Sequence, residues 1–437
     1  MADFAVDLLK LTSVKESVVV SPLSLVAALS ILERGAGGDT QSQIVDALKR
    51  KSHNDVPELI RKLAAADGVA MAVATKFFLA NGLKIGQQYN DAITKDFNVT
   101  AERLDFRDQG LTVKTVNDFV SEATRQMIPS LLSGDFYQPD MRAFLVNAVY
   151  FKGQWATRFD PDVTQEDTFH GMNGDRKESF MAIHALKDCR FTVAHGTQVL
   201  ALPYKDKEYE FVIFLPLESV KFEDFRENLT GAVMKELLEK ATKESTGVNV
   251  TIPKFKTTSQ PQMKQMLQRL GISHLFESGC DLKGVCETED LFVDDVIHKA
   301  VVEVSEEGTK AAAATGMVMN RLRPMPHLAP PTFRADHPFV YGIFLLGEPI
   351  FLGQERYEVR RGEFPLSLMV TICSNNFRLT TCSLQVDEEG RELDPVAAKV
   401  KGMMFTLRNI YPVFHADHPF VYGVFQRHQP ILIGQYC

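Results

Sequence analysis

The sequence predicts an α+β fold, with helices and strands in blocks rather than in strict alternation. Two observations indicate this. Several segments repeat apolar residues at the spacing of a helix, whereas others are continuously apolar or alternate with a period of two, as strands do. With 437 residues, 45% of them hydrophobic, the chain can bury a large core.

Helical patterns occur in the first third of the chain. Residues 22–32 are mostly apolar, Ser21 is placed to cap a helix there, and Pro22 suits its first position. Thr40 and Gln43 have the spacing of a capping box, which predicts the start of a second helix. A third set recurs at helical spacing: Val113, Val116, Val120, Ala123 and Met127.

Three later segments have strand patterns. Residues 143–151 are continuously apolar except for Asn147, which is typical of a central strand covered on both faces. Residues 209–217 show the same pattern. Alternation is clearest in the next segment, which predicts a half-buried strand: Val248, Val250 and Ile252.

Composition excludes some partners and compartments. A net charge of −8 argues against nucleic acid as a partner, and no apolar run is long enough to cross a membrane. The first residues, Met-Ala-Asp-Phe, lack the basic start and apolar run of a signal peptide. Six scattered cysteines favour reduced thiols. We therefore expect a cytoplasmic protein; the alternative is secretion by an unconventional route.

The sequence contains no recognisable catalytic motif. It lacks a Gly-x-Ser-x-Gly elbow, a His-Glu-x-x-His pair and a dinucleotide-binding glycine pattern. Asp336 and His337 are adjacent, but neighbours in a strand point to opposite faces, so we expect a structural role for them. The sequence therefore predicts a protein that is not an enzyme and has no cofactor and no metal site.

A segment near the carboxyl end occurs twice. Phe-Arg-Ala-Asp-His-Pro-Phe-Val-Tyr-Gly at 333–342 reappears, with His in place of Arg, at 414–423. Residues 356–384 between the copies show no periodicity and are expected to form an irregular connector. We interpret residues 385–437 as a degenerate duplicate of the preceding carboxy-terminal segment.

Residues 301–315, Val-Val-Glu-Val-Ser-Glu-Glu-Gly-Thr-Lys-Ala-Ala-Ala-Ala-Thr, closely resemble the hinge of the serpin family of serine protease inhibitors. Further family motifs follow in the expected order over roughly residues 3–355. They are Ser-Pro-Leu-Ser at 21–24, Asn-Ala-Val-Tyr-Phe-Lys-Gly-Gln-Trp at 147–155, Leu-Pro-Tyr at 202–204, Pro-Lys-Phe at 253–255, Leu-Gly-Ile at 270–272, Ile-His-Lys-Ala-Val at 297–301 and Ala-Asp-His-Pro-Phe at 335–339.

The resemblance implies a serpin domain over residues 1–355, with three β-sheets, about nine helices and an exposed reactive loop at about 306–331. It also implies a suicide mechanism, in which a protease cleaves the loop and is trapped as a covalent acyl complex when the loop inserts into the largest sheet. The partner would be a serine protease, or a cysteine protease, and the inhibitor a monomer. The alternative is a non-inhibitory serpin that acts in binding, as a chaperone or in storage.

The hinge has the residues that insertion requires. An inserting strand needs small inward side chains and no proline, because it must donate hydrogen bonds on both sides. If Thr309 points inward, so do Ala311, Ala313 and Thr315, while Lys310 points outward. No proline occurs between 301 and 323. The hinge set by resemblance is Glu306, Glu307, Gly308, Thr309, Ala311, Ala312, Ala313, Ala314 and Thr315.

Family spacing places the residue before the cleaved bond at Leu322, so the reactive bond is Leu322–Arg323, with Arg321–Leu322 as the second choice. Cleavage after Arg323 is disfavoured, because Pro324 would follow the bond. A leucine at this position predicts a chymotrypsin-like or elastase-like target, or a cysteine protease that prefers leucine.

The resemblance also implies a polar latch where the central strands separate. Its members would be Ser21, Ser24, Asn147 and His298, and Trp155 would lie near the point at which the loop enters. Buried polar groups need partners, so such a network could have one arrangement before insertion and another after it.

Overall fold

The computed structural model describes residues 1–48, 57, 68–134, 140–172, 174–287, 290–306, 329–356, 420–426 and 429–436. They belong to two compact units, Met1–Tyr357 and Glu358–Cys437. The α-helices among the described residues all lie in the first unit. They are α1 Ala2–Leu11, α2 Pro22–Glu33, α3 Gly38–Leu48, α5 Gln87–Phe97, α6 Gln109–Ala123, α7 Phe222–Asn228, α8 Gly231–Lys240 and α9 Met263–Arg269.

The described strands of the first unit form three sheets, as the family resemblance implies. The five-stranded sheet has the order β11 Phe255–Ser259, β12 Asp295–Val304, β4 Ala143–Gly153, β2 Val69–Ala80 and β3 Ala101–Leu104. The six-stranded sheet has the order β1 Val18–Val20, β15 Glu348–Glu355, β14 Phe339–Leu345, β9 Tyr209–Pro216, β8 Thr197–Pro203 and β7 Arg190–Ala194. The four-stranded sheet has the order β13 Thr332–Arg334, β10 Val248–Pro253, β6 Gly174–Leu186 and β5 Gln165–Gly171.

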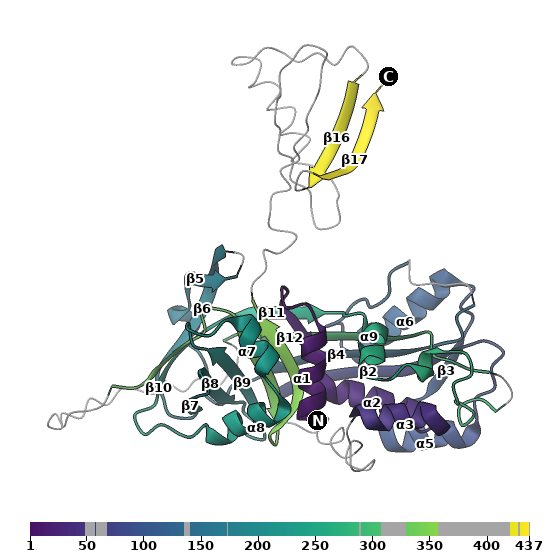
Figure 1. The fold of residues 1–437 in the computed structure, drawn as a ribbon, viewed down its shortest axis with the longest axis horizontal. Coiled ribbons are helices and arrows are strands. Elements are labelled where there is room, and N and C mark those ends of the chain that lie inside the picture. The colour runs from purple at the N-terminus through teal and green to yellow at the C-terminus, as the bar shows by residue number, and fades with distance from the viewer. Residues whose placement is uncertain are drawn as a thin grey trace. The chain divides into compact units, whose positions relative to one another are not determined.

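Helices cover both faces of the five-stranded sheet (Figure 1). Phe77 packs in a cluster with side chains of α2, α3 and α5, whereas the next residue, Phe78, packs in a cluster with side chains of α6. This alternation is the period of a strand whose two faces are both buried. The apolar segment 143–151 was predicted to be such a central strand, and β4 is buried at every position from Ala143 to Phe151.

Most of the predicted elements are confirmed. Helix α2 begins at Pro22, and the Ser21 side chain accepts a hydrogen bond from the amide of Ser24. Strand β9 and the alternating burial of β10 also match the predictions. The third predicted helix, α6, ends at Ala123, so Met127 lies beyond it.

The predicted capping box at Thr40 and Gln43 is wrong. Helix α3 begins at Gly38, so both residues lie inside it. The Thr40 hydroxyl contacts His274 Nδ1 at 2.9 Å, and Gln43 Oε1 accepts the amide of Ser273 at 2.9 Å. These side chains therefore bind a segment far along the chain, which local spacing does not reveal.

The second unit contains one described hairpin, β16 Phe420–Gln426 and β17 Gln429–Tyr436. These two strands pair antiparallel as a two-stranded sheet.

Candidate functional site

The candidate site is built around two parallel neighbours in the five-stranded sheet. Strands β4 and β12 pair in parallel, with Asp295 opposite Phe144 at one end and Glu303 opposite Lys152 at the other. Strand β12 ends at Val304, and the next described strand, β13 from Thr332, belongs to the four-stranded sheet. A segment that turned back from the end of β12 would run antiparallel to β12 and, because the pair is parallel, antiparallel to β4 as well.

Within the predicted hinge and reactive bond, only Glu306 lies among the described residues. Glu307, Gly308, Thr309, the alanines 311–314, Thr315 and the bond residues Arg321, Leu322 and Arg323 lie outside them.

Beneath the middle of this strand pair, the structure brings Ser21, Ser24, Asn147 and His298 into one buried hydrogen-bond network. His298 on β12 lies directly opposite Asn147 on β4, and its Nδ1 is 2.7 Å from Asn147 Oδ1. The same oxygen accepts the Ser24 hydroxyl at 2.8 Å. The Ser21 amide donates to His298 Nε2 at 3.2 Å, and the Ser21 hydroxyl donates to the carbonyl of Ile350 at 2.8 Å.

These contacts define the state of the imidazole. Nε2 faces an amide donor and therefore accepts, so Nδ1 carries the proton and donates to Asn147. Burial of the fully enclosed ring lowers the pKa of His298 to about 3. His298 is therefore neutral at physiological pH, and its charge does not oppose separation of the strands.

Two partners in this network were not predicted from the sequence. Thr75 on β2 accepts a hydrogen bond from Asn147 Nδ2 at 2.8 Å, and Ile350 on β15 contributes only its backbone carbonyl. A threonine in an apolar strand and a backbone oxygen carry no sequence signal of their own. Strand register alone could have identified Thr75, which lies opposite Asn147.

Trp155 lies at the carboxyl end of β12, where the chain leaves this strand. Its indole N–H donates to the carbonyl of Ser305 at 2.7 Å. The ring stacks on Tyr204, with centroids 4.8 Å apart and planes inclined by 8°. The side chain is 5% exposed, so a change in the position of Ser305 would alter a buried and well-defined environment.

Glu306, the last described residue before the loop, is held from two sides. Its carboxylate accepts the Thr164 hydroxyl at 2.8 Å and pairs with Lys254 Nζ at 2.8 Å. Desolvation raises the pKa of Glu306, but the bonds from Lys254 and Thr164 outweigh it and lower the pKa below its ordinary value. Glu306 is therefore an anchored anion, and Lys254 and Thr164 are contacts that the sequence did not indicate.

The argument that Asp336 and His337 point to opposite faces is wrong. The two residues lie between β13 and β14, where strand alternation does not apply. His337 Nδ1 lies 3.0 Å from Asp336 Oδ1, and Arg334 also pairs with Asp336, at 2.7 Å. His337 Nε2 contacts the carbonyl of Pro216 at 2.8 Å, so the ring bridges two segments.

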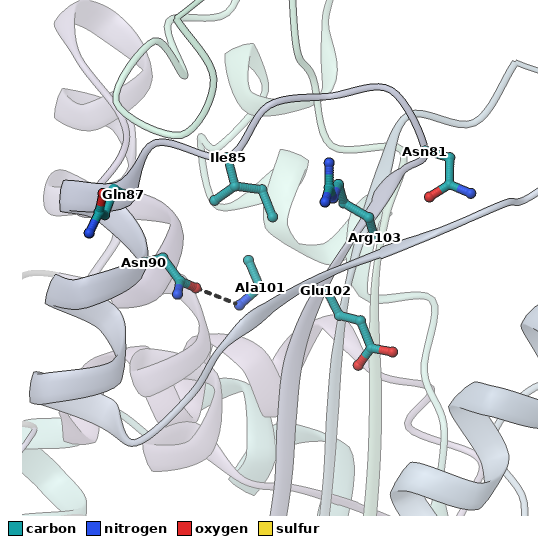
Figure 2. A pocket seen from close by; sticks show the side chains of 7 residues that line it. All are labelled: Asn81, Ile85, Gln87, Asn90, Ala101, Glu102 and Arg103. Carbon is teal, nitrogen blue, oxygen red and sulfur yellow. Dashed lines mark hydrogen bonds between the residues drawn. The ribbon is translucent and has the colours of Figure 1, made fainter.

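A pocket of about 470 Å³ lies beside β3, at the far edge of the five-stranded sheet (Figure 2). In it, the amide of Ala101 donates to Asn90 Oδ1 at 3.2 Å. The pocket is lined by Asn81, Ile85, Gln87, Asn90, Ala101, Glu102 and Arg103. None of these is a predicted site residue. Among the described residues, no group of three or more His, Cys, Asp or Glu could hold a metal ion. No helix in the described part of the chain is long and apolar enough to span a membrane.

Comparison with known proteins agrees with this architecture. The family model described as Serpin (serine protease inhibitor) matches residues 1–355. The chain is 34% identical over 354 residues to intracellular coagulation inhibitor 2 of Tachypleus tridentatus. The alignment covers 78% of this chain and 86% of that protein. It is 31% identical over 369 residues to leukocyte elastase inhibitor of Sus scrofa, covering 80% and 96%.

Solved structures show the same fold. The native state of tengpin, a thermophilic serpin, superposes with a TM-score of 0.73 at 26% identity, covering 82% of this chain and 93% of tengpin. Native protease nexin-1 with heparin gives a TM-score of 0.72 at 26% identity, covering 82% and 98%. The motifs, the three sheets and the family match together place this chain in the serpin family, a family of protease inhibitors.

Proposed function

We propose that this chain inhibits a chymotrypsin-like or elastase-like serine protease, or a leucine-preferring cysteine protease, by inserting its cleaved reactive loop between β4 and β12. The protease would be held as a covalent acyl complex. Relatives named as a coagulation inhibitor and an elastase inhibitor support protease inhibition in general. The loop composition, with small inward residues and no proline, supports the insertion step.

The observation that carries the proposal is the parallel pairing of β4 and β12. A loop segment inserted between them would replace one parallel ladder with two antiparallel ones. Residues 309–322 would supply about 12–15 new backbone hydrogen bonds at roughly 1 kcal/mol each, which is comparable with a typical domain stability of about 5–15 kcal/mol. The uncut protein would therefore be metastable and driven toward insertion once the loop is cleaved.

Insertion must also separate His298 from Asn147, since these residues face each other across the strand pair. In the proposed role of a latch, Ser21, which caps α2, and Ser24 in its first turn hold both partners until cleavage. The neutral ring of His298 could then exchange Asn147 for a partner on the inserted strand without burying a charge.

We assign the inhibitory domain to residues 1–355, the reactive loop to about 306–331 and the reactive bond to Leu322–Arg323, with Arg321–Leu322 as second choice. The relative named as an intracellular inhibitor supports a cytoplasmic location. The inhibitor is proposed to act as a monomer.

The proposal is tested by incubating the full chain with chymotrypsin-, elastase- and trypsin-like enzymes and with a cysteine protease. We expect a one-to-one complex that survives boiling in detergent, with the released peptide beginning at Arg323. A matched variant, Leu322→Asp, should lose the complex with leucine-directed enzymes. Clean cleavage near Leu322 with no adduct for any enzyme would instead identify a non-inhibitory serpin.

A further inference from the structure

The terminal hairpin β16–β17 repeats much of the sequence of the hairpin β14–β15 at matching positions. The two hairpins share Phe, Val, Tyr and Gly at the start of the first strand, and Gly and Gln near the end of the second. Matched identical pairs are Phe339 and Phe420, Val340 and Val421, Tyr341 and Tyr422, Gly342 and Gly423, Phe344 and Phe425, Pro349 and Pro430, Ile350 and Ile431, Gly353 and Gly434, and Gln354 and Gln435.

The pairing of the strands is also the same. Tyr341 lies opposite Gly353 in the first hairpin, and Tyr422 lies opposite Gly434 in the second. Each hairpin has a register shift at the corresponding point, after Ile343 in one and after Val424 in the other. The second hairpin therefore presents its backbone hydrogen-bonding groups in the order that the first hairpin presents to its neighbours.

The position of the first hairpin explains why residue 353 is glycine. Strands β14 and β15 lie between β9 and β1 in the six-stranded sheet, which we call the β1–β9 slot. A Cβ on Gly353 would lie 2.5 Å from the carbonyl oxygen of Val18 on β1 and 2.7 Å from Cζ of Tyr341. Since one of these atoms is backbone, no side chain fits there without displacing β1.

A hairpin outside the slot would have no β1 beside it, so only the end of the opposite tyrosine side chain, which can move, would then oppose a side chain at that position. Glycine weakens the interior of a strand, so another residue at 434 would make a free hairpin more stable. The second hairpin nevertheless keeps Gly434, together with the tyrosine opposite. Its sequence therefore meets a steric requirement of the β1–β9 slot.

The first hairpin also shows what the slot does with apolar side chains. Tyr341 packs on one face of the sheet and Val340 on the other, and both are fully buried. An isolated two-stranded hairpin is at best marginally stable in water, because it cannot bury two apolar faces. The repeated apolar residues of β16 and β17 would therefore be removed from water most completely in a slot of this kind.

We propose that the β1–β9 slot of the serpin domain can accept the chain's own terminal hairpin, so that β16–β17 is an interchangeable replacement for β14–β15. In the exchanged state, Gln435 pairs with Val18 of β1 and Val421 pairs with Phe214 of β9, as Gln354 and Val340 do in the structure. This inference is independent of the proposed inhibition, because it concerns only the packing of the six-stranded sheet.

Two differences between the hairpins favour the first one in the slot. Leu345, which is fully buried at the end of β14, corresponds to Gln426, whose amide would be buried there. Glu355, which accepts the Thr257 hydroxyl at 2.7 Å, corresponds to Tyr436. The exchanged state is therefore expected to be the minor one in the unmodified chain and the major one only when β15 is damaged.

The test uses three variants of the full chain, monitored by hydrogen–deuterium exchange and by urea unfolding. Gly353→Val places a side chain against Val18 in the first hairpin. We expect this variant to fold, with slow exchange moved from peptides of 339–355 to peptides of 420–436. The matched control Gly434→Val should keep the wild-type urea midpoint and the protection of 339–355. The double variant should fail to fold.

Two results would overturn the proposal. One is a Gly353→Val chain that fails to fold to the same extent as the double variant, since the second hairpin would then provide no rescue. The other is a folded Gly353→Val chain that keeps slow exchange at 339–355, since the second hairpin would then be unable to displace a damaged competitor.

Discussion

His298 Nδ1 lies 2.7 Å from Asn147 Oδ1, across the boundary between two parallel strands of the five-stranded sheet. The two residues are 151 positions apart in the sequence. Their contact joins the two strands between which the reactive loop is proposed to insert. The bond is buried and requires a neutral His298 ring, so protonation of this ring should lower the stability of the folded state.

We expect acid to destabilise the native state through His298. The folded-state pKa is about 3, below the ordinary value of 6.5, so the unfolded chain binds the proton first as the pH falls. The stability that the neutral ring contributes is present above pH 6.5 and is lost progressively toward pH 3. Between pH 7.5 and 5.5 this loss amounts to about 1.4 kcal/mol.

The measurement is urea unfolding at both pH values for the wild type and for His298→Gln. The variant should be less stable at pH 7.5 but should lose less stability on acidification. His337, whose pKa is raised by its bond to Asp336 against the effect of burial, acts in the opposite direction. It is present in both proteins, so it cancels in the comparison. Equal pH dependence in the two proteins would contradict a neutral His298.

Loop insertion should change the fluorescence of Trp155, the single tryptophan of the chain. Its indole N–H is bonded to the carbonyl of Ser305, directly before the loop, so insertion would alter this contact. We expect a shift in emission on cleavage of the loop, followed in a stopped-flow experiment. An unchanged spectrum in protein that has gained heat resistance on cleavage would exclude Trp155 from the entry point.

Thr309→Arg should convert the inhibitor into a substrate. Position 309 is predicted to face the interior after insertion, where an unpaired guanidinium costs several kcal/mol. Slower insertion allows hydrolysis of the acyl-enzyme, so we expect cleaved chain to accumulate at the expense of complex. The matched control is Ala312→Arg, which places the same side chain on the outward set. If the two variants form equal amounts of complex, the assigned register of the hinge is wrong.

A chain that ends at Tyr357 should fold, remain soluble and still trap protease. The first hairpin already lies between β1 and β9, so the shortened chain keeps all strands of the six-stranded sheet. Residues 386–395 of the duplicated segment resemble a degenerate hinge when Gly390 is aligned with Gly308. Arg391 and Pro395 then match Thr309 and Ala313, so this segment should not insert. Circular dichroism and the detergent gel test this prediction; loss of folding would show that the terminal segment is required for it.

Several elements follow from the sequence because their causes are local. Ser21 and Pro22 specify the start of α2 through a cap and a ring that suits the first turn. The apolar run around Asn147 specifies a strand covered on both faces. The serpin motifs extend this reading to the fold, because their order along the chain matches the family.

Other features were decided by the tertiary structure. Thr40 and Gln43 bind a distant segment instead of capping a helix, and Asp336 meets His337 because the chain there is not a strand. Thr75 and the carbonyl of Ile350 join the buried hydrogen-bond network only because distant strands and a helix converge on Asn147 and Ser21. Patterns in the sequence report which residues avoid water and which suit a turn, whereas the partner of a buried polar group depends on which distant strands become neighbours.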